Sequence, residues 1–139
     1  MSATVDKRPI PLPDPDTAPY WAAARKHEFK LPRCRLCSRY VFPPKPICPA
    51  CGEASLEWQE VSGRGTVFAF TIMRDNFMGG FEPPYSVAEV ELEEQPGLFV
   101  VANIVGCEIS AVRNGMPVEV TFEDRSESVT VPQFRPRKT

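Results

Sequence analysis

Residues 34–51 read CRLCSRYVFPPKPICPAC and contain two Cys-x-x-Cys pairs separated by ten residues. The first pair is Cys34 and Cys37, and the second is Cys48 and Cys51. Each pair presents two thiolates to one ion, and two such turns facing each other complete the tetrahedral sulfur shell that zinc prefers. The stretch holds too little apolar material for a core of its own. We therefore expect these four cysteines to bind one structural zinc ion per chain.

Other chemistry is open to the same four thiols. A dithiol redox pair, two disulfides or an iron site would each use them, and the number of sulfurs alone does not exclude iron. Zinc is favoured by the ligand pattern, and four sulfurs leave no open position for a substrate. Gly52 gives the second turn a permissive end, whereas Ser38 stands at the corresponding place in the first turn, where we expect backbone strain.

The segment before the cysteines divides into two parts. Proline occupies every second position from 9 to 15, so residues 1–16 are expected to form an extended arm. Pro19 is tolerated in the first turn of a helix, and good helix formers follow, which predicts a helical segment within residues 17–33. A short helix is marginal alone, so its aromatic face with Trp21 must dock on its own domain or on another chain.

The chain after the cysteines has the pattern of a β domain. Apolar and polar residues alternate around Ala88, Val90 and Leu92, and Gly and Pro turns punctuate the apolar stretches. We predict a mainly β protein with an N-terminal helix, a zinc ribbon over residues 34–55, and a five-stranded OB-fold barrel with a C-terminal tail over residues 56–139. A small open sandwich is the alternative for this β domain.

Length and charge restrict the function further. The chain has 139 residues, with 16 Lys or Arg and 18 Asp or Glu, which suits one domain with a small appendage and excludes a multi-domain enzyme. The near-neutral total averages a net +4 over residues 1–55 and a net −9 over residues 56–128. A globally basic nucleic-acid binder is therefore disfavoured. No apolar run is long enough for a membrane helix and no secretory signal is evident, so we expect a cytoplasmic protein with reduced thiols.

The sequence offers no group of residues suited to catalysis by this chain alone. Cys107 is the fifth cysteine, but the only histidine, His27, lies far from it in the sequence. No acid–base pair can be singled out among the glutamates. We interpret Cys107 as a plain strand or loop residue and His27 as a surface residue.

Several motifs together resemble the DUF35 family, the zinc-ribbon and OB-fold proteins found beside thiolase-like enzymes. The resemblance covers about residues 20–136, and its most specific elements are the four cysteines followed by SGRGTV. Further motifs are LEWQEVSGRGTVFAFT (56–71), PPYSVAEVELEE (83–94), VGCEISAVRNGMPVEVTFED (105–124) and PQFRP (132–136). The resemblance implies a rubredoxin-like ribbon and a non-catalytic accessory subunit of a thiolase or aldolase-like enzyme. Such a subunit would form a hetero-oligomer with that enzyme, complete its acyl-CoA binding site and stabilise the complex, while the catalytic residues belong to the partner.

If CoA is the shared ligand, its anionic phosphates suit the basic ribbon rather than the acidic barrel. The candidate CoA-binding residues are Arg35, Arg39, Lys45, Tyr40 and Phe42. The loop RDNFMGGFEPP (74–84) carries aromatic residues around two glycines, and exposed aromatics favour contact with another subunit or with a bound acyl group. The candidate partner contacts are Trp21, Phe77, Met78 and Phe81. The alternative for the three cations is that they only solvate the ribbon, and for the aromatic residues that they pack within the chain.

Two other functions stay open on the sequence. Zinc ribbons and OB barrels both occur in proteins that bind single-stranded nucleic acid, although the acidic barrel should repel a phosphate backbone. A redox or metal-delivery protein would use the Cys-x-x-Cys pairs directly.

Overall fold

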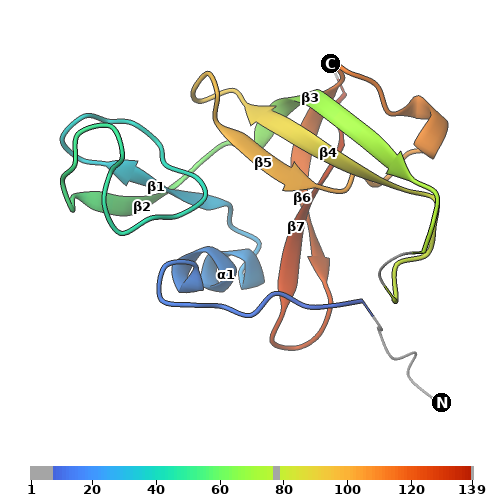
Figure 1. Ribbon diagram of the computed structural model, residues 1–139, viewed down its shortest axis with the longest axis horizontal. Helices are drawn as coiled ribbons and strands as arrows, with labels where there is room; N and C mark the ends of the chain where they lie inside the picture. The colour runs from blue at the N-terminus through green and yellow to red at the C-terminus, as the bar shows by residue number, and fades with distance from the viewer. Residues whose placement is uncertain (1–7, 77–78, 139) are drawn as a thin grey trace.

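A short helix and a small two-stranded sheet precede a larger curled sheet in the computed structural model, which describes residues 8–76 and 79–138 (Figure 1). The first part comprises α1 (Ala18–Arg25), β1 (Lys30–Cys34) and β2 (Leu56–Glu60). The second comprises β3 (Arg64–Met73), β4 (Tyr85–Leu92), β5 (Phe99–Ala102), the 3-10 turn η1 (Ile109–Ala111), β6 (Pro117–Asp124) and β7 (Thr130–Pro136).

The larger sheet is antiparallel throughout, with the strand order β5-β4-β3-β6-β7. A bulge between Val67 and Ala69 bends β3, and a bridge between Ile104 and Phe134 brings the chain after β5 beside β7. The sheet therefore curls into a five-stranded half-barrel, which confirms the predicted mainly β architecture with an OB-fold.

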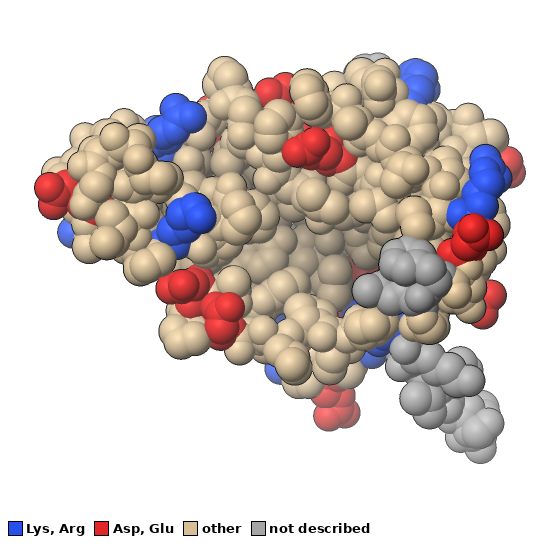
Figure 2. All heavy atoms as spheres, viewed as in Figure 1, with Lys and Arg blue, Asp and Glu red and all other residues tan. Residues whose placement is uncertain are grey.

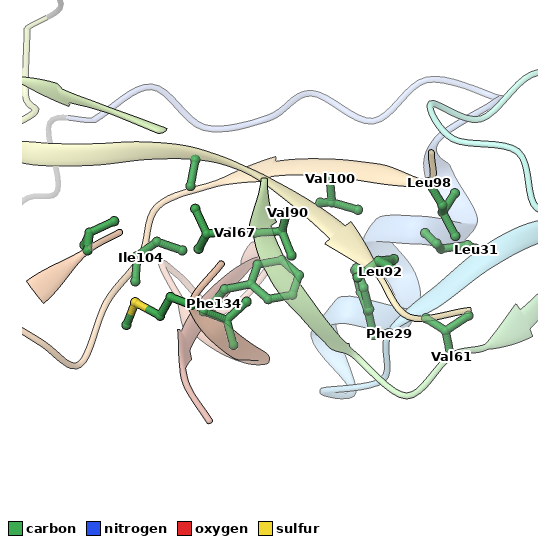
Figure 3. Packing of buried hydrophobic residues seen from close by; sticks show 14 of the residues in the cluster. Phe29, Leu31, Val61, Val67, Val90, Leu92, Leu98, Val100, Ile104 and Phe134 are labelled. Carbon is green, nitrogen blue, oxygen red and sulfur yellow. The ribbon is translucent and has the colours of Figure 1, made fainter. Parts of the chain in front are cut away.

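The interior of the half-barrel follows the predicted alternation. Ala88, Val90 and Leu92 point inward and are buried, while Glu89 and Glu91 between them are only partly covered. Phe134 is fully buried among them, and Figure 3 shows it at the centre of the cluster. The same cluster continues through the side chains of α1, β1 and the β2–β3 connection, namely Tyr20, Phe29, Leu31 and Val61. The helical segment and the barrel thus share one hydrophobic core.

α1 ends earlier than the sequence pattern predicts. The expected helical segment reached toward residue 33, but the helix stops at Arg25 and β1 begins at Lys30. His27 adopts a left-handed φ of 59°, and two bonds, from the His27 N–H to Ala24 O and from the Glu28 N–H to Ala23 O, close a Schellman turn. No helix among the described residues has the length and apolarity needed to cross a membrane.

β1 and β2 pair antiparallel from Lys30 opposite Glu60 to Cys34 opposite Leu56. They form the stem of the ribbon. The ribbon therefore begins before residue 34 and ends after residue 55, which are the bounds that the sequence predicted. The cysteine-bearing loops lie beyond the Cys34 end of the stem, and α1 packs against β1 and β7 at the other end (Figure 1).

The turn after β4 ties the ribbon to the half-barrel. The Gln95 side chain accepts a hydrogen bond from the Tyr40 N–H at 2.8 Å and donates one to the Tyr40 carbonyl at 3.1 Å. Glu94 accepts a bond from the Ser62 N–H at 2.7 Å, and Glu93 pairs with Arg64 at 2.7 Å. Three consecutive side chains of one turn therefore hold both the ribbon and the β2–β3 connection.

Gly65 shows why the SGRG segment needs glycine at the start of β3. A Cβ atom at Gly65 would lie 2.6 Å from the backbone oxygen of Glu91, closer than real Cβ atoms approach. The strands β3 and β4 therefore meet closely at this point, where only glycine leaves room for the backbone.

Candidate metal centre and partner surface

The four predicted cysteines meet at one point of the ribbon. Cys34 ends β1, and the other three lie on the loops between β1 and β2. The Sγ atoms of Cys34 and Cys51 are 3.6 Å apart, those of Cys37 and Cys48 are also 3.6 Å apart, and all four lie within 4.8 Å of one another. Cys34 and Cys48 are buried, whereas Cys37 and Cys51 are exposed.

These separations fit a tetrahedral zinc site. Zinc–sulfur bonds of about 2.3 Å in tetrahedral geometry place neighbouring sulfurs about 3.8 Å apart. The observed spacing is close to this value, and the thiols occupy all four positions of such a shell. When zinc is bound, it supplies the positive charge that keeps four neighbouring thiolates together.

The two Cys-x-x-Cys turns are built alike. The Ser38 N–H donates to Cys34 O at 2.9 Å, and the Gly52 N–H donates to Cys48 O at 2.8 Å. A second backbone bond also occurs at the same place in each turn. The Cys34 N–H donates to Arg39 O at 2.9 Å, and the Cys48 N–H donates to Glu53 O at 3.0 Å. The pair of turns therefore has an internal two-fold repeat, as expected for two turns facing one ion.

Backbone N–H groups within each turn point at the first sulfur. The N–H of Cys37, with a smaller contribution from that of Leu36, lowers the pKa of Cys34 to about 7. The N–H groups of Cys51 and Ala50 likewise lower the pKa of Cys48. These dipoles stabilise the thiolate form that binds a metal ion.

The two turns carry different residues at their left-handed position, and this difference gives a prediction. Ser38 has a φ of 66° and Gly52 a φ of 79°, so a non-glycine residue holds the left-handed conformation in the first turn alone. We expect Ser38→Gly to stabilise the zinc-bound chain by about 0.5–1 kcal/mol, because relief of left-handed strain exceeds the added entropy of the unfolded chain. The reciprocal Gly52→Ser should destabilise it by a similar amount, although a Cβ atom there meets nothing within 4 Å.

Urea unfolding in the presence of zinc measures both changes. Equal destabilisation by the two substitutions would contradict the expected opposite signs.

The predicted CoA-binding residues lie in two different surroundings. Arg35, Arg39 and Lys45 are exposed on the ribbon. Tyr40 is half-buried with the Arg33 guanidinium 4.7 Å from its ring centre, and Phe42 is half-buried with its ring 5.4 Å from that of Tyr20. The three cations therefore face outward, while both aromatic residues pack toward the main core. The small core of the ribbon itself uses Val41 and Leu56 beside the buried cysteines.

The structure brings two of the predicted partner contacts together. Trp21 on α1 and Phe81 after β3 line one cavity of about 490 Å³, although they are far apart in the sequence. Its wall is mostly apolar and includes Val87, Val101 and Pro132. Phe77 and Met78, the other two predicted contacts, lie outside the described residues.

A second cavity of about 510 Å³ lies along β5 and shares Trp21 and Val101 with the first. It also includes Phe42 and Pro43 from the ribbon and Phe99 from β5. Sequence reasoning did not single out β5 as part of a site. The available signal was the stretch PGLFVVANIVGC (96–107), which contains no charged residue.

The surroundings of His27 and Cys107 indicate structural rather than catalytic roles for both side chains. His27 Nε2 lies 2.9 Å from Asp124 Oδ1, and the imidazole stacks on Phe122 with 5.0 Å between ring centres. A hydrogen bond from Thr130 and then the one from His27 lower the pKa of Asp124. Burial raises the pKa of Cys107, which opposes formation of a nucleophilic thiolate.

A zinc ribbon joined to an OB-fold half-barrel is the class of protein that this fold and site define. Residues 21–57 match the family model described as the rubredoxin-like zinc ribbon domain of ChsH2, and residues 58–123 match the model for the C-terminal OB-fold domain of ChsH2. The chain belongs to the DUF35 family, to which these two domains and the relatives below assign it. The predicted zinc ribbon with four cysteines is thereby confirmed.

Three relatives show how far the similarity extends. A DUF35 domain-containing scaffold protein of Methanothermobacter thermautotrophicus is 35% identical over 94 residues, which are 65% of this chain and 68% of that protein. A probable enoyl-CoA hydratase alpha subunit of Thermomonospora curvata is 35% identical over 129 residues, covering 93% of this chain but 40% of that protein. The chain thus spans less than half the length of this last relative.

The third is a solved structure, the Ltp2-ChsH2(DUF35) aldolase. One chain of it superposes with a TM-score of 0.83 and 34% identity, covering 91% of this chain and 98% of that chain.

Proposed function

We propose that this chain is a non-catalytic accessory subunit of a thiolase-superfamily enzyme, either a thiolase or an aldolase-like enzyme, in the reducing cytoplasm. It binds structural zinc through Cys34, Cys37, Cys48 and Cys51. It forms a hetero-oligomer with a thiolase-like partner, stabilises that complex and completes its binding site for acyl-CoA thioesters. The names of its relatives, an aldolase with a DUF35 chain, a hydratase subunit and a scaffold protein, support this role.

One observation carries the proposal. The cysteine and histidine side chains that could act in catalysis mostly have structural roles in this chain. Four of its five thiols converge on one metal centre that has no open position. The only histidine is held by Asp124 and Phe122. The Thr130 hydroxyl donates to Asp124 at 2.7 Å, but this bond and the one from His27 lower the pKa of Asp124, which makes that carboxylate a weak base for activating a nucleophile. Chemistry on a thioester would therefore use the partner's residues.

The apolar cavities supply the second support. Trp21, Val101 and Phe42 line hollows on one face that combine apolar walls with few charges, which is the character of a surface covered in an assembly. Figure 2 shows this face hollowed between the ribbon, β5 and α1, with mostly uncharged atoms around the hollow.

A nucleic-acid role is the less favoured alternative. Glu89 and Glu91 project from the outer face of β4, next to the apolar hollow, and the segment from 56 to 128 carries a net charge of −9. A phosphate backbone would be repelled there.

The CoA contact is testable through the exposed cations of the ribbon. In the complex with its thiolase-like partner, the triple variant Arg35→Glu, Arg39→Glu, Lys45→Glu should raise KM for acyl-CoA about tenfold with kcat nearly unchanged. The loss concerns ground-state binding of phosphate groups and spares the reacting centre. Steady-state kinetics of the purified complex measures both constants.

The matched control is the pair Lys26→Glu and Arg113→Glu, which reverses exposed charges outside the ribbon loops and should leave KM unchanged. An assembled triple variant with the KM of the wild type would remove CoA binding from the ribbon. Failure of the wild-type chain to assemble would contradict the accessory role itself.

A further inference from the structure

The outer edge of β5 has an incomplete hydrogen-bond ladder. β5 is the terminal strand of the larger sheet, and β4 pairs with one of its two edges. Within residues 8–76 and 79–138, no strand pairs with its other edge.

The register fixes which backbone groups face outward. The Leu92 N–H donates to Leu98 O at 2.9 Å, so these two residues form a hydrogen-bonded pair of the β4–β5 ladder. Such pairs alternate along an antiparallel ladder, which makes Val90 with Val100 the next one. Phe99 lies between these two pairs, and Val101 lies between Val100 and the next such pair at Ala102, so the N–H and C=O groups of Phe99 and Val101 point away from β4. The free edge therefore offers two donors and two acceptors.

Apart from its short length of four residues, this edge lacks the devices that normally protect an edge strand. Natural sheets place charges, prolines or covering segments on their edges, because an open ladder pairs with other chains. β7, at the opposite end of the sheet, carries Pro132, Arg135 and Pro136, and the segment after β5 covers part of it. β5 reads FVVA and contains neither a charge nor a proline, and Val101 is 66% exposed.

An apolar groove accompanies the open edge. The cavity of about 510 Å³ runs along Phe99 and Val101 and is closed on its far side by Trp21 and Phe42. Trp21 and Val101 also line the cavity of about 490 Å³. Among the described residues, Glu89 is the one charged residue that lines the cavity of about 510 Å³. A strand added to β5 would find backbone partners on one side and apolar side-chain contacts on the other.

We propose that β5 receives an extended segment of the partner subunit as an additional antiparallel or parallel strand, with apolar side chains of that segment in the groove beside Trp21. The inference rests on the proposed accessory role and adds the mode of binding. Backbone hydrogen bonds supply affinity in such strand addition, and alternate side chains in the groove supply selectivity.

A second copy of this chain is the less suitable occupant. Four residues of extended chain span only about 13 Å. Pairing of two β5 edges would therefore bury far less than the roughly 800 Å² per subunit of a stable interface. It would also leave the groove unfilled, because β5 of the copy brings only its own short strand. An extended segment of a partner protein can fill both the edge and the groove.

Variants at Val101 test the ladder directly. Val101→Pro removes an outward N–H and no bond to β4, and proline is tolerated where the N–H side of an edge strand faces away from its sheet. Val101→Lys adds the charge that protects natural edges. Val101→Thr keeps the N–H and the branched shape, and Leu12→Lys makes the same apolar-to-charged change at an exposed site on the N-terminal arm.

We expect Val101→Pro and Val101→Lys to weaken the complex with the thiolase-like partner by about tenfold to hundredfold, as titrated by calorimetry. Val101→Thr and Leu12→Lys should bind like the wild type. Amide hydrogen exchange gives a readout that needs no variant. In the free chain the Phe99 and Val101 amides should exchange faster than Val100 and Ala102, and in the complex they should become protected.

The outcomes distinguish strand addition at β5 from the accessory role on which it rests. A wild-type complex that the Val101 variants leave intact, or in which the Phe99 and Val101 amides stay unprotected, overturns strand addition but keeps the accessory role. Absence of any complex with the wild-type chain overturns the accessory role. A dimer of this chain alone that protects both amides would make a second copy the occupant and also overturn the proposal.

Discussion

Replacing Cys48 with serine is expected to empty the metal centre and unfold the ribbon. Cys48 is fully buried, and its sulfur lies 3.6 Å from that of Cys37. A serine hydroxyl does not supply the thiolate that a structural zinc site needs, and zinc binding at such sites is coupled to folding. The ribbon core has only Cys34, Val41, Cys48 and Leu56 to hold it otherwise.

The expected result is a fall in zinc content from about one per chain to nearly none, with loss of the partner complex, because the ribbon stem carries part of the shared core. Metal analysis by mass spectrometry after gel filtration measures the first effect, and co-purification measures the second. Cys107→Ser is the matched control, since this fifth cysteine lies outside the cluster and should leave the zinc content unchanged. A Cys48→Ser chain that retained zinc and assembled normally would show that the site assignment is wrong.

Phe134→Ala should produce the largest loss of stability in the half-barrel. The Phe134 side chain is fully buried, and its ring meets that of Phe29 edge to face at 6.0 Å. Truncation of a buried phenylalanine leaves a cavity and costs about 3–5 kcal/mol. Because Phe29 belongs to the segment after α1, the loss should loosen the ribbon from the barrel as well as the barrel itself (Figure 3).

Urea unfolding followed by tryptophan fluorescence measures this change, because Trp21 and Trp58 both pack against the shared cluster. Phe68→Ala is the control: Phe68 is 56% exposed, and its loss should cost less than about 1 kcal/mol. Similar losses from the two substitutions would contradict the placement of Phe134 at the centre of the core. Two separate transitions in the wild type would contradict a shared core.

The metal centre and the barrel pattern could be predicted because they depend on local spacing. Two Cys-x-x-Cys pairs define a tetrahedral site whatever the rest of the chain does, and the inward positions 88, 90 and 92 follow from the two-residue period of a strand. The strain at Ser38 was also predicted, because the two turns must end alike and one lacks glycine.

Other features depend on contacts between distant segments and carry no local signal. The end of α1 at Arg25 depends on a left-handed His27, which Asp124 and Phe122 of β6 hold in place. Gln95 has the sequence context of a turn residue. Its side-chain amide nevertheless hydrogen-bonds to both the N–H and the C=O of Tyr40 in the ribbon, as a neighbouring strand would. The groove beside β5 forms only after the sheet curls and α1 docks, so the sequence indicated Trp21 and Phe42 but neither Phe99 nor Val101.

The predicted CoA contacts likewise combine features that the local sequence indicates with features that depend on contacts between distant segments. The basic character of the ribbon follows from composition, and Arg35, Arg39 and Lys45 are indeed exposed. Which of them approaches a phosphate group depends on how a partner is placed against the ribbon. The predicted aromatic contacts Tyr40 and Phe42 pack toward the main core, because the ribbon is docked on the barrel rather than extended from it.

The molar mass of the complex that this chain forms with its thiolase-like partner tests the central claim most directly. The two proteins should be co-expressed, purified and examined by gel filtration with light scattering at low micromolar concentration. Our account predicts a hetero-oligomer with zinc bound to this chain, and acyl-CoA turnover that requires the partner's active site. Recovery of this chain only as a lone monomer, beside a partner that is fully active without it, would contradict the account.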